Sequence, residues 1–194
     1  IKIIERNDLA QYDKQVLAEL KAEGKTIGMD NAPQADTKQA QESKDYSFPL
    51  RRDEFMLVTS PFGMRQDPIN GSKQQMHKGI DIRTKQDDVL ATESKGKVAS
   101  VNANANTAGG KSVEVEYERE NGDKVKVSYL HLSSIDVKVG DEVNAGQKLG
   151  VSGNTGNRTT GEHLHFGVKQ ISSDGTSRDL DPASYLAEIA QKGN

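Results

Sequence analysis

Two of the chain's four histidines lie two positions apart in the short stretch GEHLHF, residues 161–166. Side chains alternate between the two faces of a β-strand, so His163 and His165 would share one face while Leu164 and Phe166 occupy the other. Two neighbouring imidazoles on one face provide half of a metal or catalytic site. The simpler alternative for this stretch is a solvated strand that carries two surface histidines.

A second group of candidate ligands lies in MHKGIDI, residues 76–82, where His77 and Asp81 share one strand face. A straight strand would hold their Cα atoms about 13 Å apart, too far for both side chains to reach one ion. A helix would bring positions i and i+4 within about 6 Å, but Gly79 and the β-branched isoleucines beside Asp81 disfavour a helix. We therefore expect an extended chain that bends near Gly79.

The chain contains no cysteine, which excludes disulfides, thiolate zinc sites and thiol nucleophiles. Any metal site must be built from histidine and carboxylate side chains. Catalytic zinc usually has three protein ligands and leaves a fourth position to water. His77, Asp81 and one member of the His163 and His165 pair would supply such a set. The other member of the pair, with His131, would lie beside the ion in reach to move protons.

Two residues near these candidates allow a different interpretation. His131 ends the alternating run KVKVSYLH, and if the alternation continues it points to the same side as Val127 and Tyr129, as an interior histidine. Glu162 could be mistaken for the general base of an HExxH motif. In a strand, however, Glu162 would lie on the face opposite to the two histidines. GEHLH also lacks the helical spacing of that motif.

The elements expected around these residues are mostly short strands. From about residue 46 onward, alternating runs separated by turn residues indicate an antiparallel β domain. The clearest is a hairpin in which two alternating runs, 113–117 and 125–129, flank an Asn121-Gly122 turn. Residues 137–153 read as a further meander of strands. Asp181 followed by a proline predicts a short C-terminal helix.

The first 46 residues have a different character. Apolar residues at helical spacing predict one amphipathic helix at about 8–23, and the polar stretch 28–45 reads as a linker. The helix could pack on the main domain, form part of a stalk, or fold over the site as an inhibitory segment. The first residue is Ile1 rather than Met, which favours removal of a leader and therefore export.

Composition narrows the class of protein. Only 33% of the 194 residues are hydrophobic, so a compact domain must share the chain with polar segments. The formal net charge of -3 leaves no basic surface for nucleic acid. No apolar run approaches the roughly 20 residues that cross a bilayer, so we expect no membrane span within this sequence.

Taken together, the motifs resemble the lysostaphin-like, or LytM-type, zinc metalloendopeptidases, which cut peptide cross-bridges in bacterial cell walls. The similarity covers about residues 47–187, with the motifs in the order of that family. The segments that carry it are SPFGMR (60–65), HKGID (77–81), YLHLS (129–133), VKVGDEVNAGQKLG (137–150), GNTGNRTTGEHLHF (153–166) and DPASYL (181–186).

Carried over by position, this resemblance makes His77, Asp81 and His165 the ligands of one Zn²⁺ and makes His131 and His163 the two catalytic histidines. It implies a mainly β fold, a curved antiparallel sheet whose groove carries the metal. Peptidoglycan stem or cross-bridge peptides would be the substrates, hydrolysed through a metal-activated water in a periplasmic, wall-associated or extracellular setting. Envelope proteins stay open as further partners.

The resemblance also divides the chain. Residues 1–46 would form the N-terminal helix and linker, 47–187 the zinc peptidase domain, and 188–194 a C-terminal tail. His163 is the preferred general base, and His131 would orient the water or stabilise the oxyanion, although these two roles could be exchanged.

The sequence departs from the family pattern in two places. NANANTAGGKSVEVEY replaces a tyrosine- and glycine-rich segment before the central hairpin, and Gly167 stands where an acidic residue is common. Both departures concern the rim of the groove and leave open which bond is cut.

Two alternative functions remain at this stage. The domain could be a catalytically idle wall-binding or amidase-activating relative of the same fold, although every ligand position is filled. Residues 137–153 also resemble half of a biotinyl or lipoyl carrier, but no lysine in a Met-Lys-Met or Asp-Lys setting forms a hairpin tip between those strands.

Overall fold

The computed structural model describes residues 2–5, 45–51, 55–66, 69, 71, 74–159 and 161–192. The helix expected at 8–23 lies outside these residues, as does nearly all of the linker expected at 28–45. The first described segment is a strand, β1 (Lys2–Glu5), which the sequence reading did not anticipate. It pairs in parallel with β2 (Phe55–Ser60).

The described part of the chain is built almost entirely of short strands, as the alternating runs predicted. The remaining elements are β3 (Gly63–Gln66), β4 (Gln74–His77), β5 (Ile80–Arg83), β6 (Asp88–Leu90), β7 (Gly96–Asn102), β8 (Lys111–Glu118), β9 (Lys124–Ile135), β10 (Glu142–Val143), β11 (Lys148–Ser152), β12 (His163–Ile171), β13 (Ser177–Leu180) and α4 (Pro182–Lys192).

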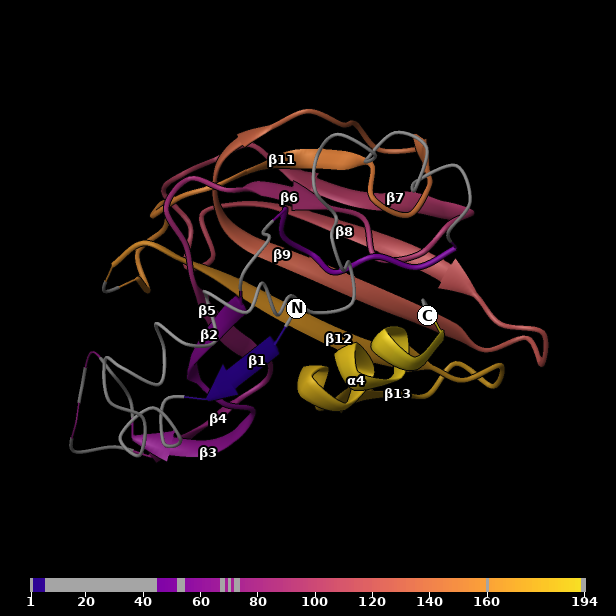
Figure 1. Cartoon of the computed structure of the whole chain (residues 1–194), viewed down its shortest axis with the longest axis horizontal. Helices are drawn as coiled ribbons and strands as arrows, with labels where there is room; N and C mark the ends of the chain where they lie inside the picture. The colour runs from indigo at the N-terminus through magenta and orange to yellow at the C-terminus, as the bar shows by residue number, and fades with distance from the viewer. Residues whose placement is uncertain are drawn as a thin grey trace.

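One large sheet runs in the order β1-β2-β5-β12-β9-β8-β7-β10, and its pairings from β2 onward are antiparallel. Strand β11 pairs with both β6 and β9, β13 pairs with β12, and β3 and β4 form a separate two-stranded sheet. Figure 1 shows the long strands β9 and β12 side by side through the centre of the molecule. A mainly β, antiparallel fold is therefore confirmed.

The predicted central hairpin is confirmed as β8 and β9. Val113 and Val115 of β8, and Val127 and Tyr129 of β9, are buried, while the residues between them are partly exposed. The turn between the two strands contains Gly122 at φ 89°, a left-handed conformation that glycine adopts without strain. One face of this hairpin forms the core, and the other is open.

His131 is buried, at 5% exposed, as the alternation of β9 predicted for an interior histidine. Its side chain does not join Val127 and Tyr129 in the core, however, but lines the cavity of the histidines. The pairing of β8 with β9 shifts register between Lys111 and Val113, and His131 itself has a φ of 66°. Strand β12 pairs with β9 as far as Leu130, and β11 pairs with β9 from Leu132. His131 therefore sits in a bulge where β9 changes partner, and the bulge turns its side chain to the open face.

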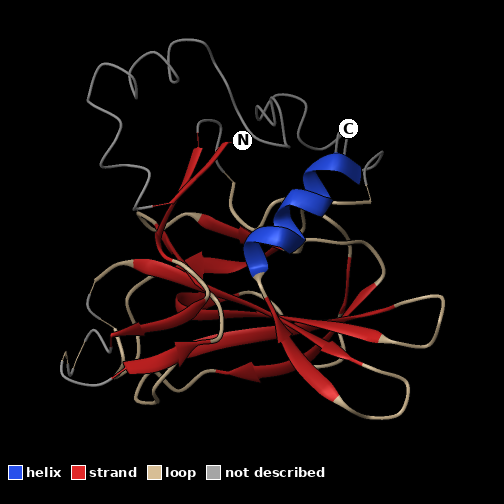
Figure 2. Cartoon of the chain, turned by 90° about the horizontal axis from the view of Figure 1, so that it is seen from below, coloured by secondary structure: helices blue, strands red, loops and turns tan. Residues whose placement is uncertain are grey.

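The C-terminal helix was predicted correctly. The backbone N–H of Ala183 donates to the Asp181 carboxylate (2.9 Å), and Pro182 opens α4, which continues through Lys192 and so includes most of the expected tail at 188–194. Tyr185 and Leu186 are among its buried residues. Figure 2 shows α4 on one side of the strands, where it contacts β12. No helix among the described residues is long and apolar enough to cross a membrane.

A buried carboxylate joins this helix to the sheet. Glu93, only 5% exposed, accepts two hydrogen bonds from the Arg119 guanidinium at 2.7 and 2.9 Å. The Tyr185 hydroxyl also donates to Glu93 and lies 3.0 Å from the Thr92 hydroxyl. Burial raises the pKa of Tyr185 well above its usual value, so the hydroxyl keeps the proton that it donates.

Tyr185→Phe should lower the free energy of unfolding by about 1–3 kcal/mol, because it removes a hydrogen bond from a buried carboxylate that water cannot replace. The matched control is Thr176→Val, which removes a hydroxyl bond to the Asp174 carboxylate in an exposed turn, where water can substitute. Chemical denaturation of both variants measures the difference. Equal destabilisation by the two variants would contradict a stabilising role for the buried network.

Candidate metal centre

Three side chains from different strands meet at the open face of the sheet. His77 is the last residue of β4, Asp81 lies in β5, and His165 lies in β12. Strand β12 pairs with β5 in a register that places His165 directly opposite Asp81. His77 joins them because β4 and β5 belong to different sheets and the chain turns between them. The predicted bend near Gly79 is confirmed.

Gly79 allows the His165 imidazole to lie directly against the backbone. A Cβ atom at residue 79 would stand 2.6 Å from the carbonyl oxygen of Phe166 and 2.7 Å from Nε2 of His165. Both separations are well inside van der Waals contact. Any side chain at position 79 would therefore displace the ring of His165 or the strand that carries it.

The donor atoms of the three residues have the spacing of a tetrahedral site. His77 Nε2 lies 3.2 Å from His165 Nδ1 and 3.3 Å from Asp81 Oδ1, and His165 Nδ1 lies 3.0 Å from the same carboxylate oxygen. A tetrahedral ion with bonds of ~2.0–2.1 Å separates its ligand atoms by about 3.3–3.4 Å. The residues present therefore fit one zinc ion with little movement.

The surroundings of the cluster favour protonation states that can bind a cation. Nδ1 of His77 lies 2.9 Å from the Pro61 carbonyl oxygen, so it carries the proton and leaves a lone pair on Nε2. Burial alone raises the pKa of Asp81, but the close contacts of its carboxylate with the His165 and His77 rings outweigh burial and hold that pKa well below its usual range. Asp81 is therefore ionised at neutral pH.

The other two histidines face the same cavity. The rings of His131 and His163 are 4.6 Å apart, and His163 Nε2 lies 3.7 Å from Asp81 Oδ1. All four histidines line a cavity of about 170 Å³, together with Asp81. Thus the structure brings every sequence-predicted site residue to one place.

Backbone carbonyls fix the orientation of both additional rings. Nδ1 of His131 lies 2.7 Å from the Thr155 oxygen, and Nδ1 of His163 lies 2.7 Å from the Gly161 oxygen. Each Nδ1 therefore donates its proton, and each Nε2 has a free lone pair. Burial lowers the pKa of His131 to about 4, so this ring is neutral at neutral pH.

Sequence reasoning missed the residues that hold His131. The Thr155 hydroxyl accepts a hydrogen bond from the Lys111 N–H (3.0 Å) and donates one to the Leu132 carbonyl (2.6 Å). The His131 N–H donates to the carbonyl of Gly109, in the segment between β7 and β8. Thr155 stands between two glycines in GNTG, but this pattern gives no sign of a partner 24 residues away.

Two further residues at the site were not singled out from the sequence. Arg158 donates to the side chain of Gln75 (3.3 Å), and both line the cavity of the histidines. Glu162, by contrast, is exposed and is not among the residues that line it. The geometry thus gives no support to Glu162 as a general base.

Comparison with known proteins gives a consistent result. The family model of peptidase family M23 matches residues 75–182, more than half of the chain. The chain belongs to peptidase family M23. The matched region contains all five of the predicted site residues, His77, Asp81, His131, His163 and His165.

Curated relatives match a large part of the chain. Lysostaphin of Staphylococcus simulans is 36% identical over 118 residues, which are 61% of this chain and 22% of lysostaphin. The peptidoglycan DD-endopeptidase ShyA of Vibrio cholerae is 36% identical over 106 residues, 55% of this chain and 21% of ShyA. The chain thus spans only about a fifth of the length of these relatives.

Solved M23 structures share the fold. The catalytic domain of lysostaphin from Staphylococcus simulans superposes with a TM-score of 0.51 at 30% identity, covering 77% of this chain and 96% of that domain. A zinc-containing peptidase from Vibrio cholerae gives a TM-score of 0.53 at 30% identity, covering 71% of this chain and 39% of the other. The resemblance found in the sequence is therefore confirmed.

Gly79→Ala should weaken zinc binding by roughly 10- to 100-fold, because the added methyl group displaces the His165 ring from the other two donors. The matched control is Gly167→Ala on the same strand as His165, where a Cβ atom would meet its nearest neighbours at 3.5 Å or more. Competition with a fluorescent zinc chelator measures both affinities. Tight zinc binding by Gly79→Ala would mean that the ring does not depend on this gap.

Proposed function

We propose that this chain is a zinc metalloendopeptidase that hydrolyses peptide cross-links in bacterial peptidoglycan. The observation that carries the proposal is the arrangement of five side chains in one cavity. Three of them, His77, Asp81 and His165, present donor atoms 3.0–3.3 Å apart. The other two, His131 and His163, each turn an unprotonated Nε2 toward the same space.

His77, Asp81 and His165 would hold the ion. Zinc in such a site supplies a Lewis acid for the scissile carbonyl and lowers the pKa of a water ligand to about 7. Asp81 contributes the negative charge, and the two imidazoles contribute neutral nitrogen donors. The Pro61 carbonyl keeps His77 in the tautomer that binds through Nε2.

His163 is our proposed general base. Its Nδ1 proton is engaged by the Gly161 carbonyl, so Nε2 is the atom that can accept a proton from the attacking water. Its position 3.7 Å from Asp81 Oδ1 places that nitrogen beside the three donors. A ring that has accepted the proton can then pass it to the leaving amine.

His131 has a related but different role in this proposal. Because its pKa is lowered to about 4 by burial, it is a poor proton acceptor and a poor hydrogen-bond donor through Nε2. A neutral Nε2 lone pair can accept a hydrogen bond from the attacking water and so orient it. This reasoning favours orientation of the water over stabilisation of the oxyanion, the other role considered from the sequence.

The relatives support the proposed substrate. Lysostaphin and ShyA are 36% identical to this chain, and ShyA is named a peptidoglycan DD-endopeptidase. We propose that residues 47–187 form the peptidase domain, preceded by residues 1–46 and followed by 188–194, and that it acts outside the cytoplasm on wall peptides. An idle relative of the same fold would be expected to lack metal donors, whereas all three are present here.

Removing the proposed base and removing a proposed ligand should have different consequences. His163→Ala should lower kcat by roughly 10²- to 10⁴-fold and keep one zinc per chain, because its side chain supplies no ligand. Asp81→Ala should lose both zinc and activity. Metal analysis after dialysis, combined with turnover measurements, checks both variants. Near-normal activity of His163→Ala would refute its assignment as the base.

Purified cell-wall sacculi provide the direct test of the reaction. The zinc-loaded chain should release fragments with new amino termini inside the peptide cross-links, and a chelated sample should release none. Mass spectrometry of the fragments identifies the bond. Intact cross-links after incubation with sacculi of several wall chemistries would argue for a binding role instead of hydrolysis.

A further inference from the structure

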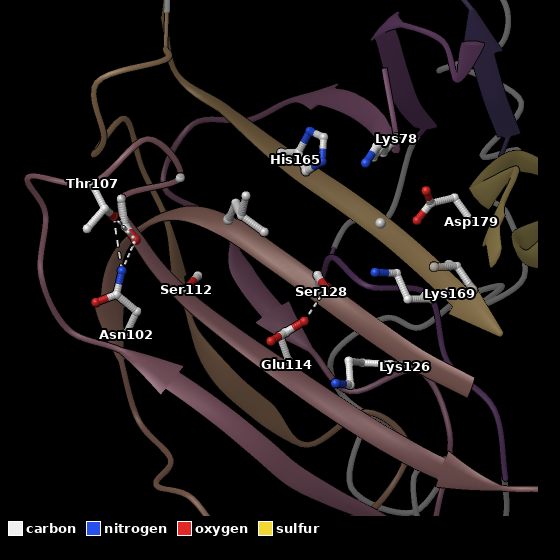
Figure 3. A pocket seen from close by; sticks show the side chains of 15 residues that line it. Lys78, Asn102, Thr107, Ser112, Glu114, Lys126, Ser128, His165, Lys169 and Asp179 are labelled. Carbon is white, nitrogen blue, oxygen red and sulfur yellow. Dashed lines mark hydrogen bonds between the residues drawn. The ribbon is translucent and has the colours of Figure 1, made fainter. Parts of the chain in front are cut away.

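A second cavity continues from the metal centre along the open face of the sheet. It has a volume of about 390 Å³, and Figure 3 shows its lining, which includes Lys78, Lys126 and Lys169. Gly109, Leu130 and His165 line both this cavity and the smaller one around the histidines. The two cavities therefore form one groove that leads away from the proposed zinc ligands.

Strand register sets the order of side chains along this groove. His165 of β12 lies opposite Leu130 of β9, Gly167 lies opposite Ser128, and Lys169 lies opposite Lys126. All of these residues lie on the open face, because the alternate positions on both strands are buried. On the open face of β12, Lys169 is thus the second residue beyond His165, after Gly167.

Lys126 lies directly opposite Lys169, and like charges at paired positions repel. On their other flanks Lys126 lies opposite Glu116 and Lys169 lies opposite Asp179. No ion pair joins Lys78, Lys126 or Lys169 to a carboxylate among the described residues. Other lysines on this sheet are paired, such as Lys124 with Glu116 at 3.2 Å. Three lysines that form no ion pair among the described residues therefore gather in one groove of a chain whose net charge is -3.

The carboxylates of the groove neutralise this group only in part. Glu114 and Asp179 line the same cavity, but Glu114 accepts a hydrogen bond from the Ser128 hydroxyl at 3.0 Å. Figure 3 shows this bond on the side of the cavity away from Lys78. The lining thus carries three lysines and two carboxylates, an excess of one positive charge next to the site.

Gly167 leaves the space between the lysines and the metal centre unfilled. A Cβ atom there would meet only ordinary contacts, the Lys78 carbonyl oxygen at 3.5 Å and Ser128 Cβ at 3.9 Å. The backbone therefore does not demand glycine at this position. Its lack of a side chain keeps the groove open between Lys78, Lys126 and Lys169.

We propose that this groove binds a free carboxylate of the substrate peptide through Lys126 and Lys169, with Lys78 at its inner end. Lys169 lies four positions after His165, about 13 Å along β12, and a lysine side chain reaches back about 6 Å. An extended peptide advances about 3.4 Å per residue, so the carboxylate lies roughly two to four residues from the scissile bond. The inference rests on the proposed function and specifies its substrate as an acidic wall peptide rather than an uncharged glycine bridge.

Two synthetic cross-linked peptide dimers test this inference. One carries free carboxylates two to four residues from the cross-link, and the other has carboxamides at the same positions. Their dissociation constants are measured by calorimetry with the zinc-loaded full chain carrying His163→Ala, so that binding is recorded without turnover. The carboxylate peptide should bind roughly tenfold more tightly, as expected for charge-assisted hydrogen bonds, and the preference should weaken at high salt.

Variants of the groove identify the residues responsible. In the same background, Lys126→Gln with Lys169→Gln should abolish the preference, and Gly167→Glu should do the same by placing a carboxylate among the lysines. Lys148→Gln is the matched control, because Lys148 pairs with Asp88 and Asp136 outside this groove. Equal affinities for the two peptides, no binding of either one, or a preference that survives in the double variant would overturn the inference.

Cleavage of the same peptides by the unmodified zinc-loaded chain separates this inference from the proposed function. Cleavage of both dimers at equal rates would retain the peptidase and reject carboxylate recognition. Preferential binding of the carboxylate dimer without cleavage of either would retain recognition and reject the peptidase.

Discussion

The antiparallel register between β5 and β12 is the constraint on which the site depends. It sets Asp81 opposite His165, and these two side chains converge because paired residues in adjacent strands are close neighbours. A shift of β12 by one residue would send His165 into the core and bring Phe166 to the open face, while Asp81 stayed in place. Burial of the alternating apolar residues fixes the strand register and therefore also the positions of Asp81 and His165. These apolar residues are Ile80, Ile82, Leu164 and Phe166.

Core and site are thus the two faces of the same strands. Beneath the histidines, Tyr129 and Phe166 pack edge to face with ring centroids 5.5 Å apart, and the Phe166 ring is also 6.3 Å from Tyr185 of α4. The buried Glu93 carboxylate, which Arg119 pairs, joins that helix to the sheet through the Tyr185 hydroxyl. Such packing holds the strands rigidly, which is what a metal site with donors 3.0–3.3 Å apart requires.

Backbone carbonyls complete the preparation of the imidazoles. Pro61, Thr155 and Gly161 each accept the Nδ1 proton of one histidine, namely His77, His131 and His163. His165 differs, because its Nδ1 is the atom that lies among the donors. Loops therefore decide which nitrogen of each ring faces the cavity, although the strands decide where each ring is.

The sequence alone determined the antiparallel β class, the central hairpin, the C-terminal helix and the set of residues that could form the site. These features follow from local alternation, turn chemistry and the scarcity of histidine, all of which can be read within a few residues. The break at Gly79 was also predictable, because a straight strand could not bring His77 and Asp81 to one ion.

Only the tertiary structure decided the orientation of His131, since its bulge arises where β9 exchanges β12 for β11. The roles of the Thr155 carbonyl and of the opposed lysines at 126 and 169 likewise depend on pairing between distant segments. Such pairing leaves no local pattern, because strand register and loop contacts are set by the packing of the whole sheet.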